Sequence, residues 1–255
     1  MDRPSRHELD ELGGAYDRVR GRIATACARS GRDPSGVRLV AVSKTVSVDR
    51  LRAAVSVGIA VLGENRVQEA EAKVGAVPGA SWHLVGPLQS NKVRRAVAIF
   101  DLVETVDSLD LARRLDRIVA EERPGGRLPV LLQVNVDRDP AKAGFVEPDL
   151  VPVLDELLRL PALEVRGLMT VGRQTRQVAD TRATFRALQT LGDRLRSSQP
   201  GLGPELSMGM SDDFELAIEE GATIVRVGRA LFGERPHEAG HVHGRATAGR
   251  PGAGC

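Results

Sequence analysis

The sequence predicts an α/β fold with one domain, a TIM (β/α)8 barrel with an extra helix at its N-terminus. Eight short apolar runs alternate with helix-like segments, and eight such units in roughly 200 residues fit a closed barrel. No linker-like segment interrupts the alternation, so one domain is expected. An open Rossmann-like sheet is the runner-up, but no G-x-G-x-x-G motif follows the first predicted strand.

The apolar runs are typical of strands in a parallel sheet, because helices cover both faces of such a sheet. They lie at residues 37–43, 59–64, 82–86, 100–106, 128–136, 163–169, 205–208 and 223–228. Each run is short enough for a strand and is followed by turn-forming or polar residues. We expect the C-terminal ends of these strands to carry the functional residues, as they do in TIM barrels.

Helical spacing of apolar residues marks the segments between the strands. The N-terminal segment repeats an apolar side chain every three or four positions, at Leu9, Leu12, Tyr16, Val19 and Ile23. The clearest later helices span residues 48–58, 107–122, 147–160 and 178–197. Asp107 or Ser108 is expected to cap the second of these, and Ser90 is expected to cap a helix that follows the third strand.

Composition argues against several classes of protein. The 255 residues include 36 Lys and Arg and 34 Asp and Glu, and the net charge of +2 gives no support to binding of nucleic acid or a membrane surface. The two cysteines, Cys27 and Cys255, do not suggest a disulfide framework, so a reducing cytoplasm is the simplest location. The N-terminus does not resemble a signal peptide, and no segment is long and apolar enough to span a membrane.

The barrel is expected to occupy residues 1–235, and residues 236–255 are expected to form a disordered tail. The tail is rich in Gly, Arg and His and has almost no large apolar side chains. Its histidines, His237, His241 and His243, are expected to be solvated, so no metal site is predicted.

Lys44 is the first candidate for a functional role, because it ends the stretch LVAVSK at the first predicted strand. Only four of the 36 basic residues are lysines, the others being Lys73, Lys92 and Lys142. A lysine that loses hydration at the mouth of a barrel favours its neutral amine, which can attack an aldehyde and form a Schiff base. The alternative is a lysine that extends to solvent.

A phosphate group would fit the loops after the seventh and eighth strands, where TIM barrels often bind one. Those loops read SMGMS and VGRALFG. Gly209 and Gly228 let backbone N–H groups approach an anion, and Ser207 and Ser211 add hydroxyl groups. The residues after Gly228 are typical of the first turn of a short helix, whose N-terminus favours negative charge, and Arg229 adds a positive one.

Arg226 lies two residues before Gly228, so both share one face of the eighth strand. If that face points inward, the guanidinium group lies in the mouth of the barrel and Val225 and Val227 face the helices. The alternative is an outward arginine that packs against a helix.

Six motifs, AVSKT, GENRVQEA, WHLVGPLQSNK, QVNVDRDPAKAGF, RGLMTVG and LSMGMSDDFELAIEEGATIVRVGRALFG, occur between about residue 15 and residue 235. In this order they resemble the pyridoxal phosphate homeostasis protein family, also called the proline synthase co-transcribed homologue. The resemblance implies a single-domain TIM barrel similar to the barrel of bacterial alanine racemase. It also implies that pyridoxal 5'-phosphate (PLP) is held as a Schiff base.

The resemblance implies a role for each matching residue. Lys44 would bind the cofactor, Asn65 and His83 would line its pocket, and Arg226 would lie beside the pyridine nitrogen. The phosphate cradle and its bordering loop would contain Ser207, Met208, Gly209, Met210, Gly228 and Arg229. Relatives commonly have Thr or Ser where this chain has Arg229, so its contact with the phosphate would be ionic or absent. Lys142, expected to be exposed, would be placed to handle the cofactor at the rim.

The position implied for Arg226, beside the pyridine nitrogen of PLP, bears on catalysis. An arginine cannot accept the pyridine proton, so the PLP ring would be a weaker electron sink. A racemase needs acid–base groups on both faces of its substrate, and alanine racemase takes a tyrosine from a partner subunit. The only tyrosine here, Tyr16, lies in the predicted N-terminal helix.

We therefore expect a monomeric PLP-binding protein of intracellular PLP homeostasis, without established catalysis and with apo PLP-dependent enzymes as candidate recipients. A PLP-dependent amino-acid racemase is the alternative. A barrel that binds an unrelated phosphorylated sugar is the third possibility.

Overall fold

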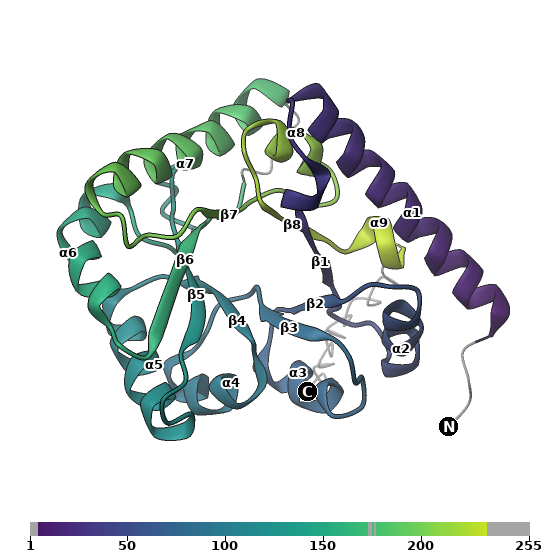
Figure 1. Ribbon diagram of the computed structural model, residues 1–255, viewed down its shortest axis with the longest axis horizontal. Helices are drawn as coiled ribbons and strands as arrows, with labels where there is room; N and C mark the ends of the chain where they lie inside the picture. Colours follow the sequence, from purple (N-terminus) through teal and green to yellow (C-terminus); the bar gives the residue numbers. More distant parts are fainter. Residues whose placement is uncertain (1–4, 173–174, 176, 234–255) are drawn as a thin grey trace, which may run out of the picture.

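Eight parallel strands close into a barrel in the computed structural model, which describes residues 5–172, 175 and 177–233 (Figure 1). The strands are β1 (Arg38–Val42), β2 (Val61–Glu64), β3 (Ser81–Leu84), β4 (Leu102–Val106), β5 (Leu128–Gln133), β6 (Leu163–Met169), β7 (Glu205–Ser207) and β8 (Ile224–Val227). They pair in sequence order, and β8 closes the ring against β1 with Val40 opposite Arg226. The predicted barrel is confirmed, and the open sheet is not found.

Helices surround the ring of strands (Figure 1). They are α1 (Arg6–Arg29), α2 (Val48–Ser56), α3 (Val67–Val74), α4 (Val93–Ile99), α5 (Leu109–Glu122), α6 (Glu147–Arg159), α7 (Val178–Ser198), α8 (Phe214–Glu219) and α9 (Arg229–Phe232). Ser108 caps α5 as predicted, because its Oγ accepts the N–H of Leu111 at 3.3 Å. The cap predicted at Ser90 is wrong: Ser90 begins a 3-10 turn (Ser90–Lys92), and α4 starts only at Val93.

The predicted N-terminal helix is α1, which lies outside the barrel and packs against α2, α8 and α9 (Figure 1). Ser5 begins it, since its Oγ accepts the N–H of Glu8 at 3.2 Å. One face is buried at the predicted helical spacing and includes Leu12, Val19 and Ile23. Because α1 contacts α2 after the first strand and α8 and α9 around the eighth strand, it joins the two ends of the described barrel.

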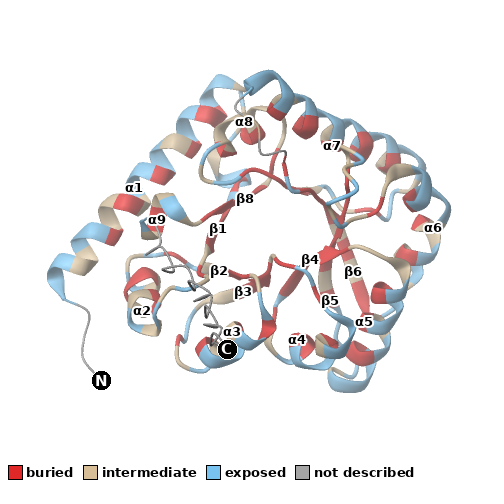
Figure 2. Cartoon of the chain, turned by 180° about the vertical axis from the view of Figure 1, so that it is seen from behind, coloured by how far each residue is buried: buried red, intermediate tan, exposed pale blue. Residues whose placement is uncertain are grey.

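The apolar core has two parts. The larger part lies between the strands and the surrounding helices, and Val225 and Val227 belong to it as predicted. The smaller part fills the interior of the barrel with Val40, Leu102, Leu131, Met169 and Ile224. Figure 2 shows the strands as a largely buried ring inside the partly exposed helices. A barrel filled in this way is a packed core, so the interior is not a pore.

None of the described helices combines the length and the apolar character that crossing a membrane requires. The predicted tail, residues 236–255, and the predicted domain boundary at residue 235 lie outside the described residues. The predictions made for His237, His241 and His243 therefore concern a part of the chain that the structure does not describe.

Candidate functional site

A cavity of about 1170 Å³ opens at the C-terminal end of the barrel strands. The loops after β1, β7 and β8 line it, together with the beginnings of α2 and α7. Six residues predicted from the sequence are among those that line it: Lys44, Met210, Ser211, Arg226, Gly228 and Arg229. Sequence positions up to 185 residues apart thus meet at one site, at the end of the barrel where TIM barrels carry their function.

Lys44 reaches this cavity because side chains alternate along a strand. Val40 points into the barrel interior and Val42 lines the cavity above it. Lys44, two positions further on, follows the same direction from the turn after β1 and is half-buried in the cavity wall. Apolar Val42 and polar Ser47 line the same cavity.

Beneath the cavity, Arg226 belongs to a buried polar cluster inside the barrel. Its Nη1 donates to Ser207 Oγ at 2.6 Å and its Nη2 donates to the Thr170 carbonyl oxygen at 2.8 Å. Ser207 Oγ in turn donates to Glu104 Oε2 at 2.6 Å, and His83 Nδ1 lies 2.8 Å from Glu104 Oε1. The inward orientation predicted for Arg226 is confirmed, and the side chain is 5% exposed.

Within this buried cluster the Glu104 carboxylate and the Arg226 guanidinium carry opposite charges. Burial raises the pKa of Glu104, but the hydrogen bond and charge of His83, the charge of Arg226 and the Ser207 hydroxyl together lower it below its ordinary value. Burial lowers the pKa of Arg226, against the opposing charges of Glu104 and Asp213. Glu104 Oε2 lies 3.9 Å from Arg226 Nη1, so a buried ion pair fixes the guanidinium below the cavity.

The loops after β7 and β8 form the far wall of the cavity. Gly209 adopts a φ of 91°, and a Cβ there would come within 2.6 Å of the Ala217 Cβ, so only glycine fits this turn. The Gly228 N–H donates to Ser211 Oγ at 3.3 Å. The short helix predicted after Gly228 is α9, and its first N–H groups have no acceptor within the helix. Arg229 forms an ion pair with Asp212.

Asp213 also lines the cavity, although sequence analysis did not single it out. Its Oδ1 accepts the N–H of Met210 at 2.6 Å. Burial raises the pKa of Asp213, and the Met210 N–H and the charge of Arg226 only partly offset that effect. The cavity therefore holds a carboxyl group that keeps its proton more readily than an exposed aspartate does.

Five predicted site residues lie near the cavity but are not among its described lining residues. His83 and Ser207 lie below it and contact Glu104. Met208 is fully buried in the outer core, and Gly209 forms the turn of its loop. Asn65 follows β2 at the same barrel end, where Gly86 packs so tightly that a Cβ would lie 2.3 Å from the Asn65 carbonyl oxygen.

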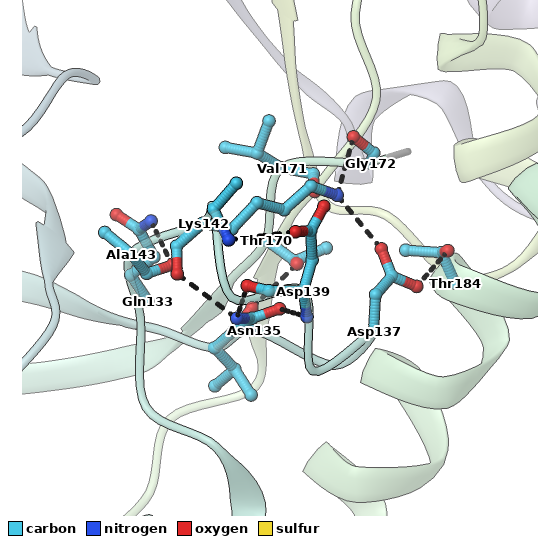
Figure 3. Close-up of polar contacts among 12 residues, drawn as sticks. Gln133, Asn135, Asp137, Asp139, Lys142, Ala143, Thr170, Val171, Gly172 and Thr184 are labelled. Carbon is cyan, nitrogen blue, oxygen red and sulfur yellow. Dashed lines mark hydrogen bonds and ion pairs between the residues drawn. The ribbon is translucent and has the colours of Figure 1, made fainter. Parts of the chain in front are cut away.

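The prediction that Lys142 is exposed is wrong, because its side chain is largely buried (Figure 3). Its side chain is 22% exposed, and its Nζ donates to Asp137 Oδ2 at 3.0 Å and to the carbonyl oxygens of Val171 and Gly172 at 3.1 and 3.2 Å. Asp137 also accepts the hydroxyl of Thr184 on α7 at 2.7 Å. The ammonium group joins the loop after β5 to the loop after β6, because its acceptors come from both.

Sequence analysis missed the buried charges that support the site: Glu64, Lys73 and Glu104. A signal for the two glutamates was present, since Glu104 interrupts the apolar run FDLVETV and Glu64 ends the run IAVLGE. Charged residues are seldom fully buried unless they are paired. A carboxylate inside a predicted barrel strand therefore calls for a buried cation as its partner.

The part of the chain that the structure describes contains no group of three or more His, Cys, Asp or Glu side chains placed to hold a metal ion. Cys27 is a free, buried cysteine on α1. Lysine, arginine, backbone N–H groups and hydroxyls at the cavity instead suit an anionic ligand that carries an electrophilic carbon.

Comparison with known proteins identifies the family. Residues 16–236 match the model of the alanine racemase N-terminal domain. The pyridoxal phosphate homeostasis protein of Pseudomonas aeruginosa is 43% identical over 227 residues, which are 87% of this chain and 95% of that protein. The chain belongs to the pyridoxal phosphate homeostasis protein family. The resemblance stated from the six motifs is thereby confirmed.

Solved structures agree with this family and with the fold. PipY of Synechococcus elongatus, solved with PLP bound, is 43% identical with a TM-score of 0.74, over 83% of this chain and all of that one. An alanine racemase of Clostridium difficile has a TM-score of 0.72 at 15% identity, over 90% of this chain and 61% of that one. That second likeness concerns the fold alone, and it confirms the predicted similarity to the alanine racemase barrel.

Proposed function

We propose that this protein binds PLP through a Schiff base at Lys44 and acts in intracellular PLP homeostasis. The observation that carries the proposal is the lysine itself, half-buried in a cavity whose other walls supply donors for an anion. The Lys44 amine would attack the aldehyde carbon, forming a C=N bond with release of one water. PLP bound in homologous PipY and the name shared by the curated relatives support the same ligand.

The residues of the cavity fit the two ends of this ligand. The N–H groups at the start of α9, the Ser211 hydroxyl and the Arg229 guanidinium are suited to a phosphate dianion. At the other end, Arg226 is held by Ser207 and Glu104, so a permanent donor faces the cavity. A donor of that kind would leave a pyridine nitrogen unprotonated and the bound ring a weak electron sink, which disfavours transamination and decarboxylation but is compatible with racemisation.

An amino-acid racemase is the alternative, and Asp213 is the observation in its favour. Racemisation needs proton-transfer groups on both faces of the reacting carbon. Lys44 could serve one face, and Asp213 lines the same cavity with a pKa raised by burial. Tyr16 is not suited to this role, because it packs near Gly58 on the outside of the barrel. Chiral analysis of amino acids after long incubation with the PLP-loaded protein separates the two functions.

The first prediction is that Lys44 carries the cofactor. Purified protein is incubated with PLP, reduced with borohydride, digested and mapped by mass spectrometry. We expect a visible absorbance band and a reduced adduct on the peptide that contains Lys44. Lys44→Ala should lose the adduct, and the control Lys92→Ala, whose lysine is also half-buried, should keep it. Full labelling of Lys44→Ala would refute Lys44 as the attachment site. A colourless wild type would refute PLP binding and favour an unrelated phosphorylated ligand.

We further propose that the protein works as a monomer in the reducing cytoplasm and passes PLP to apo forms of PLP-dependent enzymes. Cys27, which is buried and forms no disulfide among the described residues, is consistent with that compartment. Transfer would be tested by mixing the PLP-loaded protein with an apo enzyme and a scavenger of free PLP. Reactivation that survives the scavenger supports direct delivery, and its loss argues against it.

A further inference from the structure

The turn that carries Lys44 has an unfavourable backbone conformation. Thr45 has a φ of 65°, in the left-handed region where a β-branched residue is an outlier. Among the described residues other than glycine, only Arg138 shares a positive φ. Such a conformation persists only where surrounding contacts fix it, and it is concentrated at functional sites. The contacts around residues 43–46 must therefore hold this turn.

Those contacts converge on the Ser43 carbonyl oxygen, directly before Lys44. It accepts the N–H of Val46 at 3.0 Å, which closes the turn across Lys44 and Thr45. It also accepts a hydrogen bond from Lys73 Nζ, on α3, at 2.9 Å. The peptide group that leads into Lys44 is thus fixed by a charged donor from a different element.

Lys73 is anchored by Glu64, the last residue of β2. Lys73 Nζ lies 2.6 Å from Glu64 Oε1, and the Ser43 hydroxyl donates to the same oxygen at 2.7 Å. The Glu64 side chain is fully buried and that of Lys73 is 11% exposed. Both residues lie behind the turn, since neither is among the described residues that line the cavity.

Stability alone does not account for this buried pair. Removing two charges from water costs free energy that their attraction often only offsets, and an apolar pair of similar volume can be equally stable. Glu64 Oε2 is buried without a hydrogen-bond partner among the described residues, which adds to the cost. An apolar pair, however, could not donate a hydrogen bond to the Ser43 carbonyl oxygen as the Lys73 ammonium group does.

We propose that Glu64 and Lys73 are positioning residues for Lys44: their ion pair holds the strained turn so that the Lys44 amine enters the cavity in the orientation that PLP requires. This role rests on the proposed function of Lys44. Lys73 would act only through the Ser43 carbonyl. Its loss would therefore weaken PLP binding without removing the amine that binds it.

The test is a titration of the full-length protein with PLP, followed by visible absorbance, for wild type, Lys73→Met and Lys73→Met/Glu64→Gln. We expect both variants to raise the Kd for PLP about tenfold, which corresponds to about 1.4 kcal/mol. The double variant removes both charges and leaves neither ion buried alone, so it should fold even if Lys73→Met does not. Circular dichroism establishes that each variant is folded at the titration temperature.

A matched control separates positioning from a general loss of stability. Arg123 Nη2 donates to the Phe100 carbonyl oxygen at 3.0 Å, next to the N-terminal ends of β4 and β5 and away from the cavity. Arg123→Met should lower the melting temperature and leave the Kd for PLP unchanged. An equal rise of the Kd in this control would show that the effect is not specific to the turn, and would overturn the proposal.

Rescue at Thr45 provides the second readout. Glycine adopts a positive φ at little cost, so Thr45→Gly removes the strain that Lys73 is proposed to hold. Adding Thr45→Gly to the double variant should recover most of the lost affinity. An unchanged Kd in the double variant, or no recovery with Thr45→Gly, would overturn the positioning role. A wild type that forms no adduct at Lys44 would instead overturn the proposed function.

Discussion

Glu104 is the only carboxylate that directly contacts both His83 and the hydroxyl that binds Arg226 in the described barrel interior. Glu104→Gln should lower the free energy of unfolding at pH 7 by about 3 kcal/mol, because it leaves a buried guanidinium without its counter-charge. The pKa of Glu104 is lower in the folded protein than its ordinary value of 4.5. Its contribution is therefore present above that value and is lost as the pH falls through the folded pKa.

Denaturant unfolding of wild type and Glu104→Gln at pH 7, 5, 4 and 3 measures this difference. The gap between the two proteins should be largest at pH 7 and should narrow below about pH 4.5, the ordinary value for a glutamate. Glu121→Gln, at an exposed position on α5, should show no comparable gap. A gap that stays constant with pH would mean that the Glu104 charge does not stabilise the fold.

At the scale of single residues, the sequence predicted the direction of a side chain better than its hydrogen-bond and ion-pair partners. Lys44 and Arg226 could be placed because strand alternation fixes which face a residue shares with its neighbours. The residues that hold them in place could not be predicted: Lys73 on α3 contacts Ser43 after β1, and Ser207 on β7 contacts Glu104 on β4, across elements that only the closed barrel brings together. Local spacing does not contain contacts of this kind, since they depend on register and closure.

At the scale of elements, the loops after β5 and β6 are joined by the Lys142 ammonium group (Figure 3). Lys142→Met should lower the free energy of unfolding by about 1 kcal/mol, because the pair with Asp137 is partly exposed to solvent. Hydrogen exchange should become faster in both loops, since the β6 loop loses its link to the β5 loop. The Lys44 adduct should remain, because Lys142 is not among the described residues that line the cavity.

Hydrogen exchange by mass spectrometry and the borohydride assay together test this prediction. Lys92→Met serves as the control, since Lys92 belongs to the 3-10 turn before α4 and is remote in sequence from both loops. Loss of the adduct in Lys142→Met, with the two loops equally protected, would instead assign Lys142 a direct part in holding PLP, as the family resemblance implied.

The sequence predicted all the long helices, and among the short ones it predicted α2 and α9 but did not single out α3 and α4. α1, α5, α6 and α7 could be recognised because each repeats an apolar face over several turns. The short α3 and α4 were not among the clearest segments, because two turns give too little periodicity. The cap predicted at Ser90 failed because a 3-10 turn precedes α4, and a serine can begin either structure.

At the scale of the whole molecule, closure of the barrel followed from counting eight strand–helix units, but the size and shape of the cavity did not. The cavity depends on how far the loops after β1, β7 and β8 extend and on the docking of α1 against α8 and α9. Arg229 illustrates the limit. The sequence placed it in a loop that does line the cavity, whereas its ion pair with Asp212 depends on the fold of the neighbouring loop.

The closed barrel also leads to the prediction of a monomer. Every strand is paired on both sides, so the sheet offers no free edge to a second copy. A stable dimer buries about 1,200–2,000 Å². The described large apolar side chains that are exposed are only Val151, Val171, Val178 and Met210, and Val178 and Met210 line the cavity mouth. Sedimentation at micromolar concentration should therefore give one species near the chain mass of 27.3 kDa, with and without PLP.

The oligomeric state bears on catalysis as well. The resemblance to alanine racemase implies a tyrosine supplied by a partner subunit, and a monomer has no second chain to supply one. Any proton transfer on the face opposite Lys44 would then depend on this chain's own groups, such as Asp213, which lines the cavity and whose pKa is raised by burial. A dimer in sedimentation would contradict the monomer, and racemisation by the PLP-loaded protein would contradict the carrier function. Racemisation that Asp213→Asn leaves unchanged would exclude Asp213 as the second proton-transfer group.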